Sequence, residues 1–282
     1  MITAGRDLSS GDVADHYDEL DRFYRDVWGD HVHHGLWVTG REGQHEATLE
    51  MVRRVASRAK VARGSRVCDV GCGYGATARM LAGDYGAEVT GMTVSPAQRD
   101  YAAAHPAKGV EVLLGDWLRN DLPGGAFDAA VAIESTEHMP DLAGFFREAY
   151  RVLKPGGRLV VCAWLAHPAA SAMQRRWLLE PVCREGRLSQ MGSFDDYRGL
   201  YADAGFEIES VEDVSRQVKR TWPLSAGRFA AKLVRDPRYL RFLVNRHRRN
   251  RVFALTIFRI WVAFETGVMQ YGIFTGRKPV VS

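Results

Sequence analysis

Short apolar runs alternate with longer amphipathic stretches between Arg66 and Trp164, and this alternation restricts the possible folds of the chain more than any other feature. Successive strands joined by helices form parallel sheets with helices on both faces. The sequence therefore predicts an α/β fold. The predicted strands are 65–71, 87–94, 110–116, 127–135 and 158–164, and the predicted helices are 74–86, 95–105 and 141–157.

The flanking segments extend this core. Helical patterns cover 11–27 and 42–61, and a further strand is predicted at 206–214. Residues 223–262 are basic and helical, and 267–279 forms the last predicted strand. We expect an N-terminal helical cap (1–62) and a core (63–282) with insertions at about 166–200 and 218–262.

Composition excludes several classes of protein. Hydrophobic residues make up 46% of the 282, enough for a sizeable core. The polar, acidic N-terminus lacks the apolar region of a signal peptide. The most apolar long stretch carries Arg259 and Glu265, so it is a poor membrane span. The four cysteines form no CxxC pair, and reduced thiols in a cytoplasmic protein are the expectation.

Positive charge is concentrated near the C-terminus. Twelve Lys or Arg residues and one acid, Asp236, lie between Arg216 and Arg251. Such a run suits nucleic acid, an anionic membrane surface or an acidic substrate, and a solvated helix face remains an equal alternative.

A glycine-rich turn, "VCDVGCGYG", follows the first core strand and opens the first core helix. Glycines allow a ligand to approach the backbone, and the helix N-terminus offers free amide donors. Its spacing differs from the GxGxxG of dinucleotide dehydrogenases, which leaves a dehydrogenase as a distant alternative.

This turn, together with "EAYRVLKPGGRLVV", resembles class I S-adenosylmethionine-dependent methyltransferases over roughly residues 50–215. The resemblance implies a Rossmann-like, mostly parallel seven-stranded sheet, with S-adenosylmethionine as cofactor and S-adenosylhomocysteine as product. It also implies that Gly71, Cys72 and Gly73 hold the methionine part of the cofactor. Asp69 would order the loop.

The second strand ends "VTGMTVSPAQ", with Thr93 where many such enzymes have an acid. This form is similar to the cyclopropane-synthase and tocopherol-methyltransferase branches, which implies that Thr93 and Gln98 contact the ribose. In "GDW", Asp116 would lie near the adenine amino group. Trp117 would lie against the adenine ring, or else belong to the core.

Three more segments resemble the tocopherol methyltransferase-like group: "FYRDVWGDHVHHGLW", "ESTEHMPD" and "GVMQYGIFTGRKP". The group methylates small molecules. The three clustered histidines could bind a metal, but a zinc site would need a fourth ligand. We expect no metal. The cap would instead present Tyr24, Trp28, His31 and His33 to the acceptor.

His138 is the candidate general base. It follows the fourth strand, at the sheet edge where ligands gather in open parallel sheets. The "HMPD" ending is similar to that of sugar-methylating relatives, which implies a histidine base. Imidazole, with a pKa of about 6.5, suits that role, while a hydrogen-bonded turn residue is the alternative. Glu137 and Glu134 are weaker candidates, for orienting the acceptor or the cofactor's ammonium group.

Aromatic residues outside the main sheet, including Trp177 and Trp222, favour a hydrophobic or aromatic acceptor, although such residues are often core. The basic run at 216–251 could contact a membrane or an anionic group. No nucleic acid is expected, because the signature of nucleic-acid amine methylators is missing. C-, N- and O-methylation remain open, as does the oligomeric state. The alternatives are an RNA or protein methyltransferase, or a non-catalytic cofactor-binding protein.

Overall fold

The computed structural model describes residues 1–5, 7–245, 250 and 252–280. Its centre is a seven-stranded sheet with the order β4-β3-β2-β5-β6-β9-β8. The strands are β2 (Arg66–Val70), β3 (Glu88–Thr93), β4 (Val110–Leu114), β5 (Phe127–Ile133), β6 (Leu153–Ala166), β8 (Glu207–Asp213) and β9 (Met269–Arg277).

Only β9 runs against the other strands, because it pairs antiparallel with both β6 and β8. The predicted α/β fold with a mostly parallel seven-stranded sheet is confirmed. The chain order reverses between β2 and β5, and at such a switch point the carboxyl ends of the strands leave a crevice for ligands.

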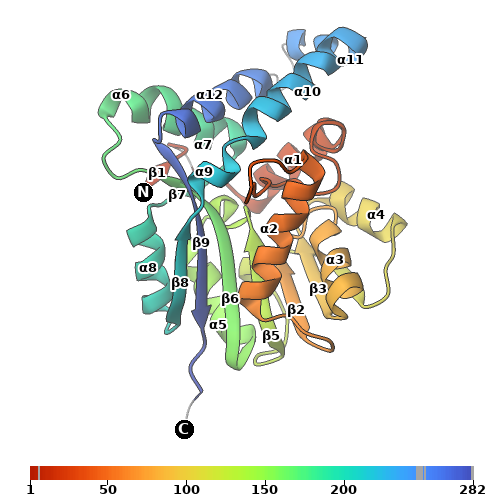
Figure 1. Ribbon diagram of the computed structural model, residues 1–282, viewed down its shortest axis with the longest axis vertical. Helices are drawn as coiled ribbons and strands as arrows, with labels where there is room; N and C mark the ends of the chain where they lie inside the picture. Colours follow the sequence, from red (N-terminus) through yellow and green to blue (C-terminus); the bar gives the residue numbers. More distant parts are fainter. Residues whose placement is uncertain (6, 246–249, 251, 281–282) are drawn as a thin grey trace.

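Helices cover both faces of this sheet (Figure 1). They are α2 (Gln44–Ala59), α3 (Ala76–Tyr85), α4 (Pro96–Ala104), α5 (Leu142–Val152) and α8 (Phe194–Asp203), with short turns η1 (Trp117–Arg119) and η2 (Thr136–His138). Alternate residues of β5 enter different cores: Ala129 and Val131 lie with α2 and α3, whereas Ala130 and Ala132 lie with α5 and α8.

The remaining elements lie above the carboxyl edge of the sheet, at the top of Figure 1. They are α1 (Ser10–Val27), α6 (Ala172–Gln174), the π-helical turn η3 (Arg175–Leu179), α7 (Glu180–Gly186), α9 (Ser215–Val218), α10 (Thr221–Arg235), α11 (Pro237–Val244) and α12 (Phe253–Glu265). Among the described residues, none of the helices has the length and hydropathy of a transmembrane segment.

The structure differs from the sequence prediction in three places. The helix predicted to reach 157 ends at Val152, and β6 begins at once, because Pro155 disfavours helix in the residue before it. Two-residue strands β1 (Ile2–Thr3) and β7 (Gln190–Met191) pair, and strands this short leave no periodic pattern. Finally, α2 packs against β5 and β6, so of the predicted N-terminal cap (1–62) only α1 and the loop after it lie above the sheet edge.

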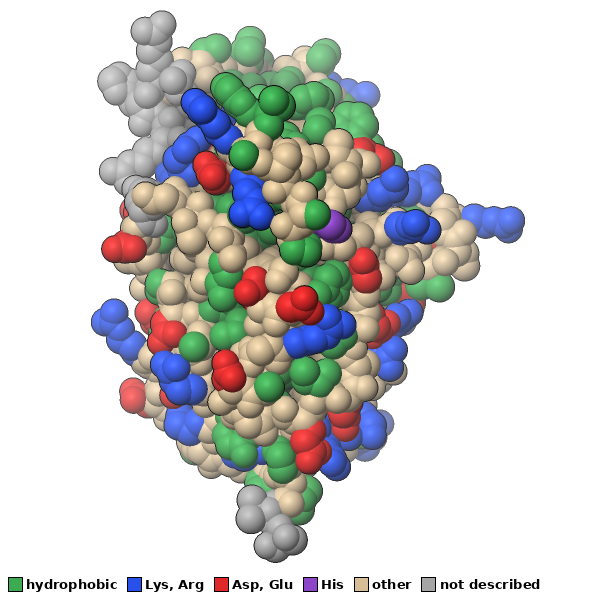
Figure 2. Space-filling model, turned by 90° about the vertical axis from the view of Figure 1, so that its left-hand side faces the viewer, with side chains coloured by type: hydrophobic (Ala, Val, Ile, Leu, Met, Phe, Trp, Pro, Cys, Tyr) green, Lys and Arg blue, Asp and Glu red, His purple; other side chains and the backbone are tan. Residues whose placement is uncertain are grey.

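Surface composition is uneven. Figure 2 shows hydrophobic side chains gathered at the top of the molecule, where Figure 1 has α6 and α12. Part of the basic run, Arg246, Arg248, Arg249 and Arg251, falls outside the described residues. The four cysteines are free and buried.

Candidate active site

Two adjoining cavities lie at the carboxyl edge of the sheet. We call the first the glycine-loop cavity. Its wall is Val13, Tyr17, Val32, Gly71, Gly73, Met92, Thr93, Val94, Gln98, Gly115, Trp117, Ile133, Glu134, Ser135, His138 and Met139. The wall combines α1 with the segments that follow β2, β3, β4 and β5, so it occupies the switch point of the sheet.

The glycine turn needs glycine for two different reasons. Gly71 has φ +76°, and a Cβ there would lie 2.4 Å from the Ser135 Cβ. Gly73 has φ +55°, but a Cβ there would meet no atom within 4 Å. The first glycine therefore lets two loops approach each other, and the second leaves open space in the cavity wall.

β3 orders this turn. The N–H groups of Gly71 and Cys72 both donate to the Met92 carbonyl at 2.9 Å. The Cys72 side chain points away from the cavity, since a Cβ on Gly91 would lie 2.8 Å from its Sγ. Asp69 is buried beneath the turn, and its Oδ2 has no hydrogen-bond partner among the described residues. Burial raises the pKa of this carboxyl to about 7.

The structure brings together the two residues predicted to contact a ribose. Thr93 donates from its hydroxyl to Gln98 Oε1 at 2.7 Å, and both side chains line the glycine-loop cavity. Trp117 also lines it, while its indole N–H donates to the Phe145 carbonyl. Asp116 instead accepts a hydrogen bond from the Leu118 N–H and does not contribute to the wall.

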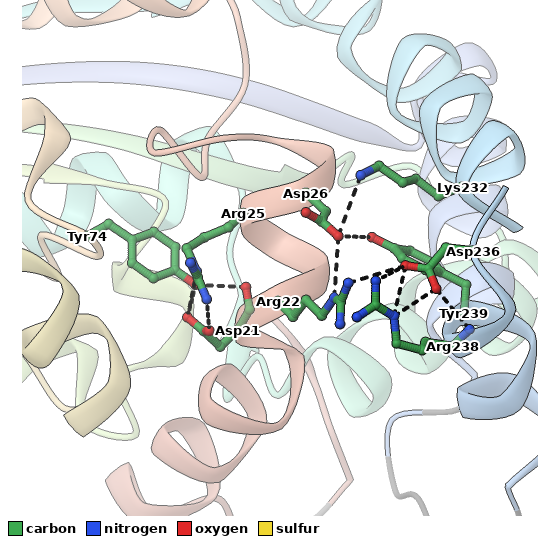
Figure 3. Close-up of polar contacts among 9 residues, drawn as sticks. All are labelled: Asp21, Arg22, Arg25, Asp26, Tyr74, Lys232, Asp236, Arg238 and Tyr239. Atoms are coloured by element: carbon green, nitrogen blue, oxygen red, sulfur yellow. Dashed lines mark hydrogen bonds and ion pairs between the residues drawn. The ribbon is translucent and has the colours of Figure 1, made fainter.

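Helix α1 is held over the cavity by bonds to the loops beneath it. Asp18 accepts from the Ser95 hydroxyl after β3, and Asp21 accepts from the Tyr74 hydroxyl at 2.9 Å, beside the glycine turn. Figure 3 shows Asp21 held by Tyr74 and by Arg25 of the same helix.

The C-terminal half of α1 is bound to α10 and α11 (Figure 3). Asp26 accepts from the Tyr239 hydroxyl at 2.9 Å and lies 3.6 Å from Lys232 Nζ. Arg22 donates to Asp236 at 3.2 Å, and hydrogen bonds from Arg238 hold the pKa of Asp236 low, at about 2. Helix α1 thus connects the glycine turn to the C-terminal helices.

We call the second space the aromatic cavity. Its wall is His16, Tyr17, Leu20, Tyr24, Trp28, Val32, His33, His34, Glu134, Glu137, His138, Trp164, Glu185, Gly186, Leu188, Trp222, Asn250, Val252, Thr256, Ile257 and Ile260. Four residues, Tyr17, Val32, Glu134 and His138, also line the glycine-loop cavity. These four residues therefore border both spaces.

Glu134 joins several elements at this border. Its Oε1 accepts from the His34 N–H at 2.7 Å, from His34 Nδ1 at 2.9 Å and from the Tyr271 hydroxyl at 2.8 Å. Burial alone would raise its pKa, but His34, through its ring and its N–H, outweighs burial and lowers the pKa to about 2. Glu134 is therefore a buried carboxylate at neutral pH.

The environment of His138 fixes its tautomer. Nδ1 lies 2.9 Å from the Arg187 carbonyl, which can only accept, so Nδ1 carries the proton. Nε2 then accepts from the Tyr17 hydroxyl at 3.0 Å. Burial lowers the pKa of this imidazole, and the bond to the Arg187 carbonyl only partly offsets it. At neutral pH the ring is uncharged, with a lone pair on Nε2.

Glu137 differs from Glu134, although both line the aromatic cavity. It accepts from the Trp164 N–H and from the Thr136 hydroxyl, and burial raises its pKa to about 8. At neutral pH it is therefore mainly a neutral carboxyl group.

Comparison with known proteins identifies the chain. The family model described as "Mycolic acid cyclopropane synthetase" matches residues 6–240. The chain belongs to this family. Tocopherol O-methyltransferase of Arabidopsis thaliana is 31% identical, over 95% of this chain and 82% of its own. The 27-O-demethylrifamycin SV methyltransferase of Amycolatopsis mediterranei is also 31% identical, over 93% of this chain and 95% of its own.

Solved structures share the fold. The [4+2]-cyclase SpnF has 30% identity and a TM-score of 0.80, covering 97% of both chains. The cyclopropane synthase MmaA2 of Mycobacterium tuberculosis has 21% identity and a TM-score of 0.84, covering 96% of this chain and 99% of its own. The predicted recognition is confirmed: the protein is a class I S-adenosylmethionine-dependent methyltransferase of the tocopherol methyltransferase-like group, acting on a small acceptor.

The glycine-loop cavity of this methyltransferase fits the cofactor. Gly73 leaves open space in its wall, Thr93 and Gln98 supply neutral polar groups, and Trp117 supplies an aromatic face. Asp69 lies beneath the turn and does not line this cavity, so it contributes to the loop rather than to the wall.

The clustered histidines have three different positions. His34 donates to Glu134 and accepts from the Trp222 indole N–H at 2.7 Å, which fixes its tautomer. His33 lines the aromatic cavity, with Nδ1 2.9 Å from the His34 carbonyl. His31, predicted to contact the acceptor, lies outside that wall, with its ring edge-on to His33.

Of the other residues predicted to bind the acceptor, Tyr24, Trp28 and Trp222 line the aromatic cavity. Trp177 does not. It lies on the π-helical turn η3 and is 61% exposed.

Three residues that bond to His138 or Glu134 in the structure were not predicted from the sequence: Tyr17, His34 and Tyr271. The spacing of Val13, Tyr17 and Tyr24 places them on one face of α1, and this pattern was a usable signal for Tyr17. Tyr271 lies 137 positions from its partner Glu134, and nothing local in the sequence pairs them.

Gly73→Ala should weaken cofactor-site binding without unfolding the protein. Its new Cβ meets no neighbour but narrows the cavity, and the positive φ costs roughly 1–2 kcal/mol. Gly64→Ala is the matched control, with φ +79°, no atom within 4 Å and a place in the turn before β2. By calorimetry, we expect S-adenosylhomocysteine to bind roughly tenfold more weakly to Gly73→Ala and normally to Gly64→Ala. Equal affinity of both variants would contradict this geometry.

Glu137→Gln should flatten the pH dependence of stability. Between pH 4.5 and about 8, Glu137 is protonated in the native protein but ionised in the unfolded chain. Its contribution to the free energy of unfolding is therefore complete below pH 4.5 and is lost as the pH rises to about 8. Glutamine does not titrate.

The measurement is thermal unfolding of both proteins between pH 5 and 8. Buried histidines such as His16, whose pKa burial lowers to about 3, act in the opposite direction, so the difference between the two proteins isolates Glu137. That difference should change by about 1–3 kcal/mol over the range. Parallel curves would mean that Glu137 is already ionised in the native protein.

Proposed function

We propose that this methyltransferase acts on a small, largely hydrophobic or aromatic natural-product acceptor held in the aromatic cavity. One observation carries the proposal: this cavity adjoins the glycine-loop cavity at Tyr17, Val32, Glu134 and His138. Tryptophan, tyrosine, leucine and isoleucine side chains make up much of its wall, and such a wall suits an apolar ring system or chain.

In this proposal the glycine-loop cavity holds the cofactor. The turn at Gly71 and Gly73 would face the methionine part, and Thr93 with Gln98 the ribose. Bound there, S-adenosylmethionine supplies an electrophilic methyl group on a sulfonium sulfur. The task of the protein is then to align the acceptor and exclude water. Helix α1, bound to the loops beneath it, provides the cover.

His138 is the proposed general base. Its Nε2 lone pair faces the border between the cavities, and the Arg187 carbonyl holds the proton on the other nitrogen. An acceptor O–H or N–H that takes the place of the Tyr17 hydroxyl would donate to Nε2 and lose its proton there as the methyl group is transferred. Glu134 contributes fixed negative charge nearby, which favours the imidazolium that results.

A second candidate function comes from SpnF. This protein is 30% identical to the present chain, yet it is named as a [4+2]-cyclase and not as a methyltransferase. A cyclase of that kind would need the same apolar cavity but would not consume the cofactor. A polymer-modifying role is disfavoured because the aromatic cavity is enclosed by α1, α7, α10 and α12.

The deciding experiment incubates the purified protein with methyl-labelled S-adenosylmethionine and separate pools of phenolic, prenyl-quinol, macrolide and alkaloid acceptors. We expect labelled product and S-adenosylhomocysteine in equal amounts with at least one apolar pool. Product formation without S-adenosylhomocysteine would support the cyclase, and the absence of labelled product with every pool would refute the small hydrophobic acceptor.

His138→Ala should lower kcat by about 10²–10⁴-fold for an acceptor that loses a proton, because the base is removed. Its affinity for S-adenosylhomocysteine should change by less than about threefold. Tyr17→Phe is the matched variant, since it removes the partner of Nε2 but keeps both the ring and the imidazole. It should lower kcat by less than about tenfold. Equal losses of turnover and cofactor affinity in His138→Ala would contradict a base.

A further inference from the structure

The helices that enclose the aromatic cavity have apolar outer faces. In α12, Thr256, Ile257 and Ile260 line the cavity. On the outer side of the same helix, Leu255 and Phe258 are 46% and 55% exposed. The helix is therefore apolar on both sides, whereas a surface helix ordinarily presents polar residues to water.

Neighbouring elements continue this outer surface. Val234 lies in the last turn of α10, Leu240 and Val244 lie on α11, and Met173 and Trp177 lie on α6 and η3. All five are more than half exposed. Helix α12 packs against η3 and α10, and α10 packs against α11, so these elements form one series across the top of the molecule (Figure 1). We call these seven exposed side chains, on η3 with α6 and on α10–α12, the apical surface.

Other exposed large apolar residues of the described chain are dispersed. Leu114 is on β4, Ile208 on β8 and Val38 in the loop after α1, and Met1 and Val280 lie near the ends. Single exposed apolar residues are ordinary, but a concentration of them marks a surface that another body covers.

Positive charge accompanies the apical surface. Arg176, Arg235 and Arg241 are exposed, and none has an ion pair with a described residue. Arg176 lies over the Trp177 ring, 5.6 Å from its centroid. The segment that forms α10 and α11 contains one acidic residue, Asp236, which lies between the two helices. Its carboxylate already forms ion pairs with Arg22 and Arg238. Unpaired arginines among exposed apolar side chains favour an anionic lipid surface and disfavour a second, equally positive copy of the chain.

We propose that the apical surface docks the methyltransferase on an anionic lipid bilayer, so that the aromatic cavity receives its acceptor from the membrane. The first part stands on the surface itself, and the second rests on the proposed function. The side chains would enter the headgroup and upper acyl region, while the sheet stays in water. Because α12 presents one side to the bilayer and the other to the aromatic cavity, a lipophilic acceptor needs to pass only this layer of helices.

The test is flotation of the full chain with vesicles of phosphatidylcholine alone or with 30% phosphatidylglycerol. We expect at least about tenfold more bound protein with the anionic vesicles, and a marked loss of binding in 0.5 M salt. Leu240→Glu with Phe258→Glu should reduce binding about tenfold or more, and Arg235→Glu with Arg241→Glu should abolish the preference for anionic vesicles.

Leu114→Glu with Ile208→Glu is the matched control, because it adds the same two charges at exposed apolar positions elsewhere. It should bind vesicles like the unaltered protein. Thermal unfolding of every variant shows whether it is folded, and a single Phe258→Glu variant replaces the double one if that unfolds.

Three results would overturn the proposal: no flotation of the unaltered protein, an equal loss in the control, or a concentration-dependent dimer that Phe258→Glu abolishes. The last would make the apical surface a contact between two copies. An assay of methyl transfer to a water-soluble acceptor distinguishes this proposal from the proposed function. Folded variants of the apical surface should retain that activity. Vesicle binding without methyl transfer to any acceptor would contradict the proposed function alone.

Discussion

One buried oxygen, Oε1 of Glu134, is the point on which the site depends. It accepts from the His34 N–H, the His34 ring and the Tyr271 hydroxyl. These donors come from the loop after α1 and from β9, and the His34 ring is in turn bound by Trp222 of α10. A charge this deeply buried persists only when its donors are in place. The carboxylate therefore fixes the loop, the sheet and α10 relative to one another.

The two cavities bordered by Glu134 are built by different means. In the glycine-loop cavity, one part of the wall is shaped by backbone: a positive φ at Gly71 and Gly73, and the bonds of the turn to the Met92 carbonyl. Side chains from α1, α7, α10 and α12 make the aromatic cavity. A backbone turn tolerates few substitutions, which suits a site for one methyl donor. A wall of side chains can be altered residue by residue, which suits a site for methyl acceptors that differ between relatives.

Much of the fold could be predicted because its signals are local. The alternation of β2 to β6 with helices follows from short apolar runs, and the turn at Gly71–Gly73 and the segment that carries Thr93 and Gln98 each occupy one short stretch. The predicted end of α5 is wrong because the prediction includes "VLKPGG" in the helix as far as 157, whereas β6 begins at Leu153. The position of α2 was missed since its amphipathic pattern shows that it packs, but not on what.

By itself, the sequence determined the α/β architecture and the methyltransferase family, because periodicity and short motifs are properties of neighbouring residues. Only the tertiary structure decided which side chains meet. His34 rather than His31 bonds to Glu134, Tyr17 reaches His138 across 121 positions, and Trp177 faces outward. Such meetings depend on how whole elements pack, and the free energy of that packing is spread over contacts that no single stretch of sequence records.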